Sequence, residues 1–181
     1  MTAPLAYSSA QKLLHWVIAL LILIQVPLAV AMTNVGEGPL QNQLYEWHKS
    51  FGLVALALVL ARVLVRLSRG APALEAGLPA WQRRAAYASH AALYGLIVLV
   101  PLLGWAGTSA CCAPVKLFWS FPLTLPISGG MPVGKRILGL HTVAAFALVA
   151  LIALHAGAAL HHHVIRRDGT LRRMLAGGRT G

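Results

Sequence analysis

Four apolar segments, at about residues 11–33, 48–69, 84–108 and 136–166, constrain what this chain can fold into. An apolar helix of about 20 residues crosses a bilayer, and only helices or closed barrels satisfy their backbone hydrogen bonds there. The second segment is the weakest, because only twelve residues separate Lys49 from Arg62. It is retained because Arg62 and Arg66 can extend their charged ends to the membrane boundary. We therefore predict an all-α fold, an integral membrane four-helix bundle that forms one domain over residues 1–181.

The composition agrees with a membrane protein. Of the 181 residues, 58% are hydrophobic and 10% are charged, and the mean hydropathy is +0.71. A net charge of +11 would suggest nucleic-acid binding in a soluble protein. Here most Lys and Arg residues flank apolar segments, so membrane topology explains them better and no nucleic-acid partner is expected.

The basic residues divide unequally between the two sides of the predicted bundle. One side holds the N-terminus, the loop after the second segment and the C-terminal tail, and the other holds the remaining two connections. The first side carries eleven of these residues: Lys12, Arg62, Arg66, Arg69, Arg83, Arg84, Arg166, Arg167, Arg172, Arg173 and Arg179. The second side carries four, namely Lys49, Lys116, Lys135 and Arg136. We therefore expect cytoplasmic N- and C-termini, with residues 109–135 as an ordered periplasmic cap.

A cleaved signal peptide is the alternative interpretation of the first segment. Residues Ala29, Val30 and Ala31 resemble a cleavage site. The apolar run is longer than is usual for a signal peptide, and cleavage would remove His15. We favour a retained helix.

Two histidines on the last segment, His141 and His155, indicate a function inside the membrane. They lie fourteen residues apart, so one helical face carries both, about 21 Å apart along the axis. Ionisable side chains at such positions are costly and usually functional. His15 in the first segment matches His155 in depth, and His48 at the start of the second matches His141. The sequence therefore predicts two histidine pairs at two depths.

Small residues follow these four histidines by one helical turn. They are Ala19, Gly52, Ala145 and Ala159, whereas Tyr94 and Arg166 follow His90 and His162. A small residue at that place leaves room for a flat macrocycle on the histidine's face. Interfacial histidines and ordinary helix packing are the alternatives.

Two haems b suit these pairs better than zinc or copper, which usually add cysteine, methionine or carboxylate ligands. The two cysteines are adjacent, and the chain has no CxxCH motif, so the haems would be non-covalent. With both axial positions occupied, such haems transfer electrons. Arg62 lies fourteen residues after His48 and has no buried carboxylate nearby in sequence. We expect it, with Arg66, to bind a haem propionate, snorkelling being the alternative.

The chain resembles the bacterial di-haem cytochrome b561 family, which includes superoxide:ubiquinone oxidoreductase. The matching stretches are LLHW near the start, WHKSFG followed by LVLARVLVRL, and the final run from LHTVAAF to RRDGTLRRM. The four-histidine arrangement is also similar to cytochrome b subunits of membrane-bound formate dehydrogenases and hydrogenases. The resemblance implies a multi-pass protein of the bacterial inner membrane. It places His15 and His155 on a cytoplasmic-side haem, and His48 and His141 on a periplasmic-side haem.

The resemblance also implies a ubiquinone site beside the inner haem. His162 lies seven residues beyond His155, and could bind the quinone carbonyl or carry its proton. His90 is the second candidate, and a plain interfacial role is the alternative for both. Cys111 and Cys112 match no family motif, and we expect free thiols or incidental loop residues in preference to a disulfide.

Three functions remain open from the sequence. The first is a superoxide oxidase, in which periplasmic superoxide donates electrons that reduce ubiquinone, steered by Lys49, Lys116, Lys135 and Arg136. Ordinary solvated loop charges are the alternative for those cations. The second function is an electron relay between a redox protein partner and the quinone pool. The third is a histidine-bearing transporter for a metal or a proton, which would carry no pigment.

Overall fold

The structure, a computed structural model, describes residues 6–75, 77–112 and 114–175. Its four long helices are α1 (Ser9–Asn34), α2 (Pro39–Arg69), α3 (Ala80–Cys111) and α4 (Gly130–His161). Two short strands, β1 (Lys116–Leu117) and β2 (Phe121–Pro122), lie between α3 and α4. A π-helical turn, η1 (His162–Arg166), and a 3-10 turn, η2 (Arg172–Met174), follow α4. Each long helix is apolar enough to cross a membrane, which confirms the all-α membrane bundle.

The helices begin where local start signals lie and extend beyond the apolar segments. Ser8 caps α1 through its hydroxyl, which accepts from the Gln11 backbone N–H at 3.3 Å, while the Gln11 side chain accepts from the Ser8 N–H at 2.9 Å. Pro39 occupies the first turn of α2, where its missing N–H costs nothing. As a result α2 begins nine residues earlier than predicted. His48 therefore lies inside α2, and its predicted place at the start of that helix was wrong.

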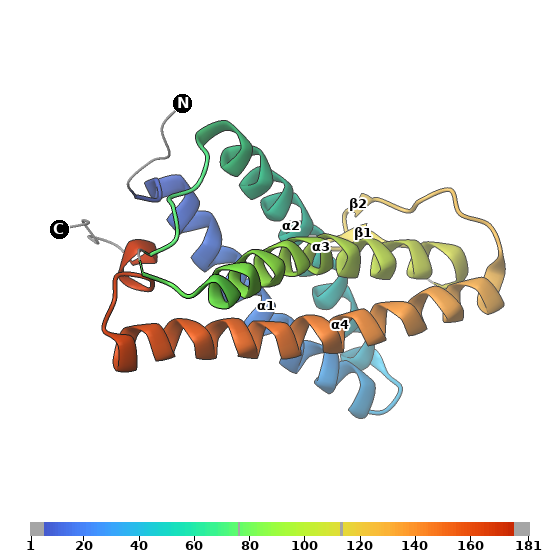
Figure 1. Cartoon of the computed structure of the whole chain (residues 1–181). Coiled ribbons are helices and arrows are strands. Elements are labelled where there is room, and N and C mark those ends of the chain that lie inside the picture. The colour runs from blue at the N-terminus through green and yellow to red at the C-terminus, as the bar shows by residue number, and fades with distance from the viewer. Residues whose placement is uncertain (1–5, 76, 113, 176–181) are drawn as a thin grey trace.

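The bundle consists of two helical hairpins, with α1 packed mainly on α2 and α3 on α4. Figure 1 shows α3 and α4 side by side, and the start of α1 and the end of α4 lie at the same end of the molecule. We call that end the terminal end, and the end that holds the α1–α2 turn and the α3–α4 connection the loop end. Two hydrogen bonds join the first and last segments at the terminal end: Lys12 Nζ to the Leu175 carbonyl at 3.0 Å and Trp16 Nε1 to the Met174 carbonyl at 2.8 Å.

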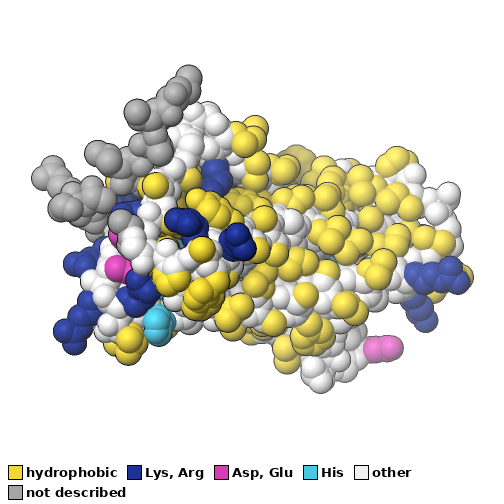
Figure 2. Space-filling view, in the orientation of Figure 1, with side chains coloured by type: hydrophobic (Ala, Val, Ile, Leu, Met, Phe, Trp, Pro, Cys, Tyr) yellow, Lys and Arg dark blue, Asp and Glu magenta, His cyan; other side chains and the backbone are white. Residues whose placement is uncertain are grey.

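Glycines allow α3 and α4 to pack closely. A Cβ on Gly107 would lie 2.8 Å from Leu138 Cγ, and one on Gly134 would lie 2.2 Å from Cys111 Cβ. Small residues at a helix contact let the backbones approach, as is common in membranes. The middle of the molecule presents hydrophobic side chains outward, whereas Lys and Arg gather mainly at the terminal end (Figure 2). This distribution suits a lipid-facing belt with charged ends.

The α3–α4 connection is shorter than the predicted loop of residues 109–135, because both flanking helices extend into it. Strands β1 and β2 pair antiparallel, and the turn between them places Phe118 and Trp119 at φ values of 45° and 63°. Bulky residues rarely adopt this left-handed conformation. It is held by the fully buried Ser50 of α2, whose hydroxyl accepts from the Phe118 N–H at 2.9 Å. Edge-to-face contacts of both rings with Trp47 also hold it.

The two cysteines are joined by a disulfide between Cys111 and Cys112, so the expectation of free thiols was wrong. The reason is local. Successive side chains of a helix diverge by about 100°, but α3 ends at Cys111, and Cys112 adopts an extended conformation. Leaving the helix between the two residues lets their side chains turn toward each other.

Candidate functional site

His48 of α2 and His141 of α4 face each other in the half of the bundle nearer the loop end. Their ring centres lie 6.3 Å apart, and the ring planes are nearly perpendicular at 86°. His141 Nδ1 lies 2.8 Å from the Val100 carbonyl oxygen. A carbonyl only accepts, so Nδ1 must donate and Nε2 keeps its lone pair when the ring is neutral. A backbone carbonyl commonly orients metal-binding histidines in this way.

The surroundings of this outer pair include two features that the sequence analysis did not identify. Gly104 of α3 lies against the His141 ring, and a Cβ there would be 3.0 Å from Nδ1. Gln25 of α1 donates from Nε2 to the His48 carbonyl oxygen at 2.9 Å. A Cβ on Gly52 would lie 3.2 Å from this same Gln25 Nε2, so helix packing, the alternative for the small residues, applies at this position. His48 Nδ1 is buried and has no hydrogen-bond partner among the described residues.

The inner cluster, nearer the terminal end, contains three histidines instead of two. The rings of His15 on α1 and His155 on α4 lie 6.4 Å apart with an interplanar angle of 70°. His90 of α3 also contacts His155, with 5.5 Å between ring centres. The sequence identified His90 only as a second quinone candidate. Its contact with His155 depends on how α3 is rotated against α4, which spacing along one segment does not specify.

Both predicted pairs have the spacing that one iron atom between two imidazoles requires. Imidazole nitrogens bind a first-row metal such as zinc at about 2.0–2.1 Å, so two opposed rings have centres roughly 6–6.5 Å apart. The separations of 6.3 and 6.4 Å agree with this value, whereas the His90–His155 separation of 5.5 Å is shorter. The buried, unpartnered His48 Nδ1 also fits a site built around a bound group. These residues could therefore hold haem, with His15 as the better partner for His155.

Arg62 and Arg66 reach the inner cluster from α2. Arg62 NH1 donates to the Gln11 carbonyl oxygen at 2.5 Å, and its charge lies within electrostatic range of His15, His90 and His155. The Arg66 guanidinium lies 5.6 Å from the centre of the Tyr94 ring. In the described part of the chain neither arginine pairs with a carboxylate. Both could therefore receive an anionic group of a cofactor.

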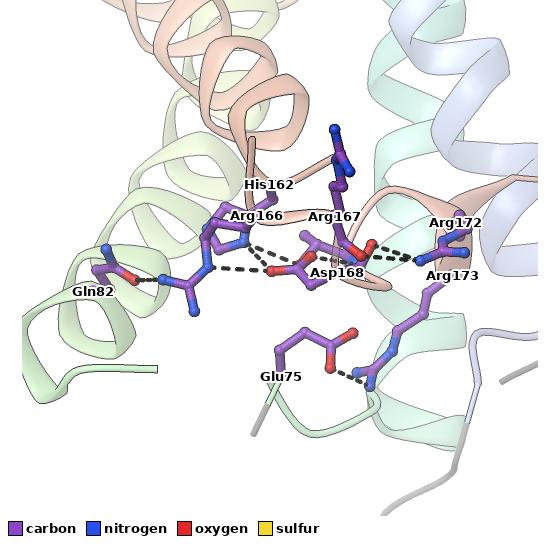
Figure 3. Close-up of polar contacts among 9 residues, drawn as sticks. Glu75, Gln82, His162, Arg166, Arg167, Asp168, Arg172 and Arg173 are labelled. Carbon is purple, nitrogen blue, oxygen red and sulfur yellow. Dashed lines mark hydrogen bonds and ion pairs between the residues drawn. The ribbon is translucent and has the colours of Figure 1, made fainter. Parts of the chain in front are cut away.

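His162 lies at the terminal end, beyond the inner cluster, and its neighbours are polar (Figure 3). Its Nδ1 donates to Asp168 Oδ2 at 2.5 Å. Arg166 approaches the same carboxylate oxygen at 3.5 Å and donates to Gln82 of α3 at 3.1 Å. The sequence analysis missed Asp168, although its place six residues after His162 in a helix-ending RRDGT run was a usable signal. The two quinone candidates therefore have different neighbours, His155 for His90 and Asp168 for His162.

The loop end contains the four cations predicted to steer an anion, and one of them is neutralised. Lys49 forms an ion pair with Glu46, so it contributes little net charge. Lys116, Lys135 and Arg136 are exposed and pair with no carboxylate in the described ranges. Three cations thus remain at this end.

Four membrane helices with two facing histidine pairs define a class of protein: a membrane electron-transfer protein that carries haem b. Comparison with known proteins specifies the family. Residues 6–177 match the family described as Prokaryotic cytochrome b561, and the chain belongs to that family. It is therefore a multi-pass protein of the bacterial inner membrane, and membership favours electron transfer over transport.

Three relatives are similar over most of their lengths. Cytochrome b561 homolog 1 of Escherichia coli is 32% identical over 93% of this chain and 96% of its own. Cytochrome b562 of Cereibacter sphaeroides is 30% identical over 97% of this chain and 98% of its own. The Yersinia pestis protein named Probable superoxide oxidase CybB is 27% identical over 93% of this chain and 95% of its own.

Proposed function

We propose that this protein oxidises superoxide at its loop end and reduces ubiquinone at its terminal end. The observation that carries the proposal is the presence of two facing histidine pairs at two depths of one bundle. His141 and His155, one from each pair, are about 21 Å apart along α4, so two electron carriers would connect the two ends. Two superoxide anions, ubiquinone and two protons would yield two O₂ and one ubiquinol.

Four histidines would hold two non-covalent haems b, His48 with His141 and His15 with His155. Haem b, when bound, supplies reversible one-electron transfer. Arg62 and Arg66 would neutralise propionate charge at the inner site, because they are partly buried and pair with no carboxylate in the described residues. With both axial positions filled, superoxide would react at an edge and not at the metal.

Electrostatics at the two ends supports the direction of this reaction scheme. The exposed Lys116, Lys135 and Arg136 give the loop end a positive potential, which raises the encounter rate of a small anion. The larger number of cations at the terminal end supports cytoplasmic termini under the positive-inside rule. His162 and His90 are the proposed quinone-site residues there, since quinone chemistry needs a group that exchanges protons near the inner cluster.

The test is rapid mixing of purified, haem-loaded protein with superoxide, with and without ubiquinone, while the haem absorbance is followed. We expect haem reduction by superoxide alone and re-oxidation when ubiquinone is added. Superoxide dismutase is the control, since it removes the donor and should abolish the reduction. If superoxide does not reduce the haems in samples without superoxide dismutase, the proposed donor is contradicted.

A redox protein partner is the second candidate donor, and a surface feature favours it. An open groove of about 760 Å³ at the loop end is lined by Leu40, Gln43, Glu46, Lys116, Trp119 and others. Aromatic residues such as the exposed Trp119 are enriched in protein-binding surfaces. Co-purification of a stable partner, together with slow reaction toward superoxide, would favour this candidate.

A further inference from the structure

A local change of backbone geometry brings Asp168 against His162. The chain leaves α4 through the wider π-helical turn η1, and Arg167 then adopts a left-handed conformation with φ 55°. The Asp168 N–H donates back to the His162 carbonyl at 3.1 Å, which closes the turn. A continuing α-helix would place a residue six positions later on a different face. Short π-helical turns are frequently found at functional sites, and this one forms a carboxylate–histidine pair.

The carboxylate of Asp168 is ionised, and this decides the position of the imidazole proton. Burial acts to raise the pKa of Asp168, but hydrogen bonds from His162 and Thr170 outweigh it and lower the pKa to about 2. Thr170 contributes its backbone N–H, which donates to Oδ1 at 2.9 Å. An ionised carboxylate only accepts hydrogen bonds. Nδ1 of His162 must therefore carry a proton, and Nε2 is the nitrogen that can gain or lose one.

We propose that Asp168 is the positioning residue that makes His162 the proton-exchanging group of the quinone site. This inference rests on the proposed quinone reaction at the terminal end. In quinone reduction the imidazolium Nε2–H would give its proton to a quinone carbonyl oxygen, leaving the neutral ring with Nδ1–H held by Asp168. The full step consumes two electrons and two protons per quinone, and water at the terminal end resupplies the ring. In quinol oxidation the Nε2 lone pair accepts the hydroxyl proton.

Other charged or titratable groups surround the pair. Arg166 bridges Asp168 and Gln82 of α3, and the ring of His161, on α4, lies 6.0 Å from that of His162. Arg172 donates to the backbone oxygens of Arg167 and Asp168 at 3.2 and 3.4 Å. From the α2–α3 connection, Glu75 pairs with Arg173 at 3.2 Å without contacting His162 (Figure 3). Asp168 is thus the carboxylate that His162 contacts, and Glu75 is a neighbouring carboxylate that it does not.

The experiment compares Asp168→Asn with the matched control Glu75→Gln in haem-loaded protein. A short-chain ubiquinol reduces the haems, so the assay does not depend on superoxide as donor. An asparagine amide can donate to Nδ1, which moves the ring proton to Nε2 and removes the lone pair that the quinol needs. We expect Asp168→Asn to lower the maximal rate by about 10²-fold, the usual size of a general acid–base contribution. Glu75→Gln should keep a rate close to that of the wild type, since Glu75 pairs with Arg173 and does not contact His162.

Two further readouts separate positioning from a structural role. The pH at which half of the ubiquinol rate is reached should move to lower pH in Asp168→Asn, because an amide stabilises the imidazolium less than a carboxylate does. The ¹⁵N resonances of His162, assigned by their loss in His162→Ala, should show the proton on Nδ1 in the wild type and on Nε2 in Asp168→Asn. Haem absorbance should be unchanged in both variants.

Several results would overturn the inference. They are a wild-type proton on Nε2 alone, equal rate losses in Asp168→Asn and Glu75→Gln, or no electron exchange between the wild type and ubiquinol. The ¹⁵N measurement on the wild type needs no variant, so poor folding of Asp168→Asn would not leave the question open. A protein that reacts with ubiquinol as predicted but not with superoxide would contradict the proposed donor and leave the Asp168 inference supported.

Discussion

At the residue scale, the two histidines of the outer pair contact neighbouring helices. His141 is hydrogen-bonded to the Val100 carbonyl and packs against Gly104, both on α3. The His48 backbone is tied to Gln25 of α1. Such supporting contacts fix ring orientation and the choice of nitrogen. Mutations of the supporting residues should therefore affect a bound cofactor without removing a ligand.

Gly104→Ala should disturb the outer haem without removing it. The added Cβ would lie 3.0 Å from His141 Nδ1, so the ring must shift by a few tenths of an ångström. We expect altered low-spin electron paramagnetic resonance signals for one haem and unchanged signals for the other. Gly95→Ala on the same helix is the control, because its Cβ would meet nothing within 4 Å. Identical spectra for both variants would mean that the contact with Gly104 is unimportant.

Arg62→Gln should lower the reduction potential of the inner haem. A nearby cation stabilises the reduced form, which is less positive, so removing the cation favours oxidation. At an effective dielectric constant of about 20, a charge several ångströms away contributes on the order of 100 mV. A spectroscopic redox titration would measure the change. Arg69→Gln serves as control, since Arg69 is exposed in the last turn of α2. Equal potentials in wild type and Arg62→Gln would support the snorkelling alternative.

At the element scale, α4 is the helix common to both histidine pairs. His141 faces α2 through His48, and His155 faces α1 through His15. Helix α3 carries no member of these pairs but packs closely on α4 and places His90 against His155. The two pairs therefore depend on different helix contacts. A mutation in one pair should leave the other pair able to bind its haem.

We predict two haems b per chain, each lost with its own pair. His48→Ala or His141→Ala should remove the outer haem, and His15→Ala or His155→Ala the inner one. Pyridine haemochrome assays against protein concentration would give the ratio. A ratio near one in the wild type would exclude two sites. Loss of both haems in a single variant would not distinguish the sites, because a bound cofactor also stabilises the fold and its loss can unfold the other site.

At the scale of the whole molecule, charge distribution distinguishes the two ends. The terminal end holds most of the cations, while the loop end has Lys116, Lys135 and Arg136 exposed above the outer pair. Long-range steering acts through the summed field and weakens with salt, because the Debye length falls from about 10 Å at 0.1 M to about 3 Å at 1 M. The three cations should therefore affect the rate of encounter with an anion.

Charge reversal at Lys135 and Arg136 should slow haem reduction by superoxide more than haem reduction by ubiquinol. Stopped-flow rates for both donors across a salt series would test this prediction. Exchanging the two charges of the Lys49–Glu46 ion pair is the internal comparison, and we expect a smaller effect there because the net charge of the pair does not change. Wild-type rates that do not vary with ionic strength would contradict steering and favour a protein donor.

Much of this protein follows from local periodicity in its sequence. The four apolar segments had to become helices, because a bilayer leaves backbone groups no other partners. The fourteen-residue spacing of His141 and His155 placed them on one face, since 3.6 residues per turn applies wherever a helix continues. The four-helix class was predictable for the same reason, and the structure confirms it.

Only the tertiary structure decided how these helices face one another. Contacts between helices depend on the rotation of each helix about its axis and on its position along that axis. Examples are the contacts of His90 with His155, Gly104 with His141 and Arg62 with Gln11. The pairing of His162 with Asp168 depends on a π-helical turn followed by a left-handed residue. The sequence by itself determined the spans and the register of the histidines along them, because helical hydrogen bonding is local. Partners across helices were decided by side-chain packing between distant segments, which no single segment contains.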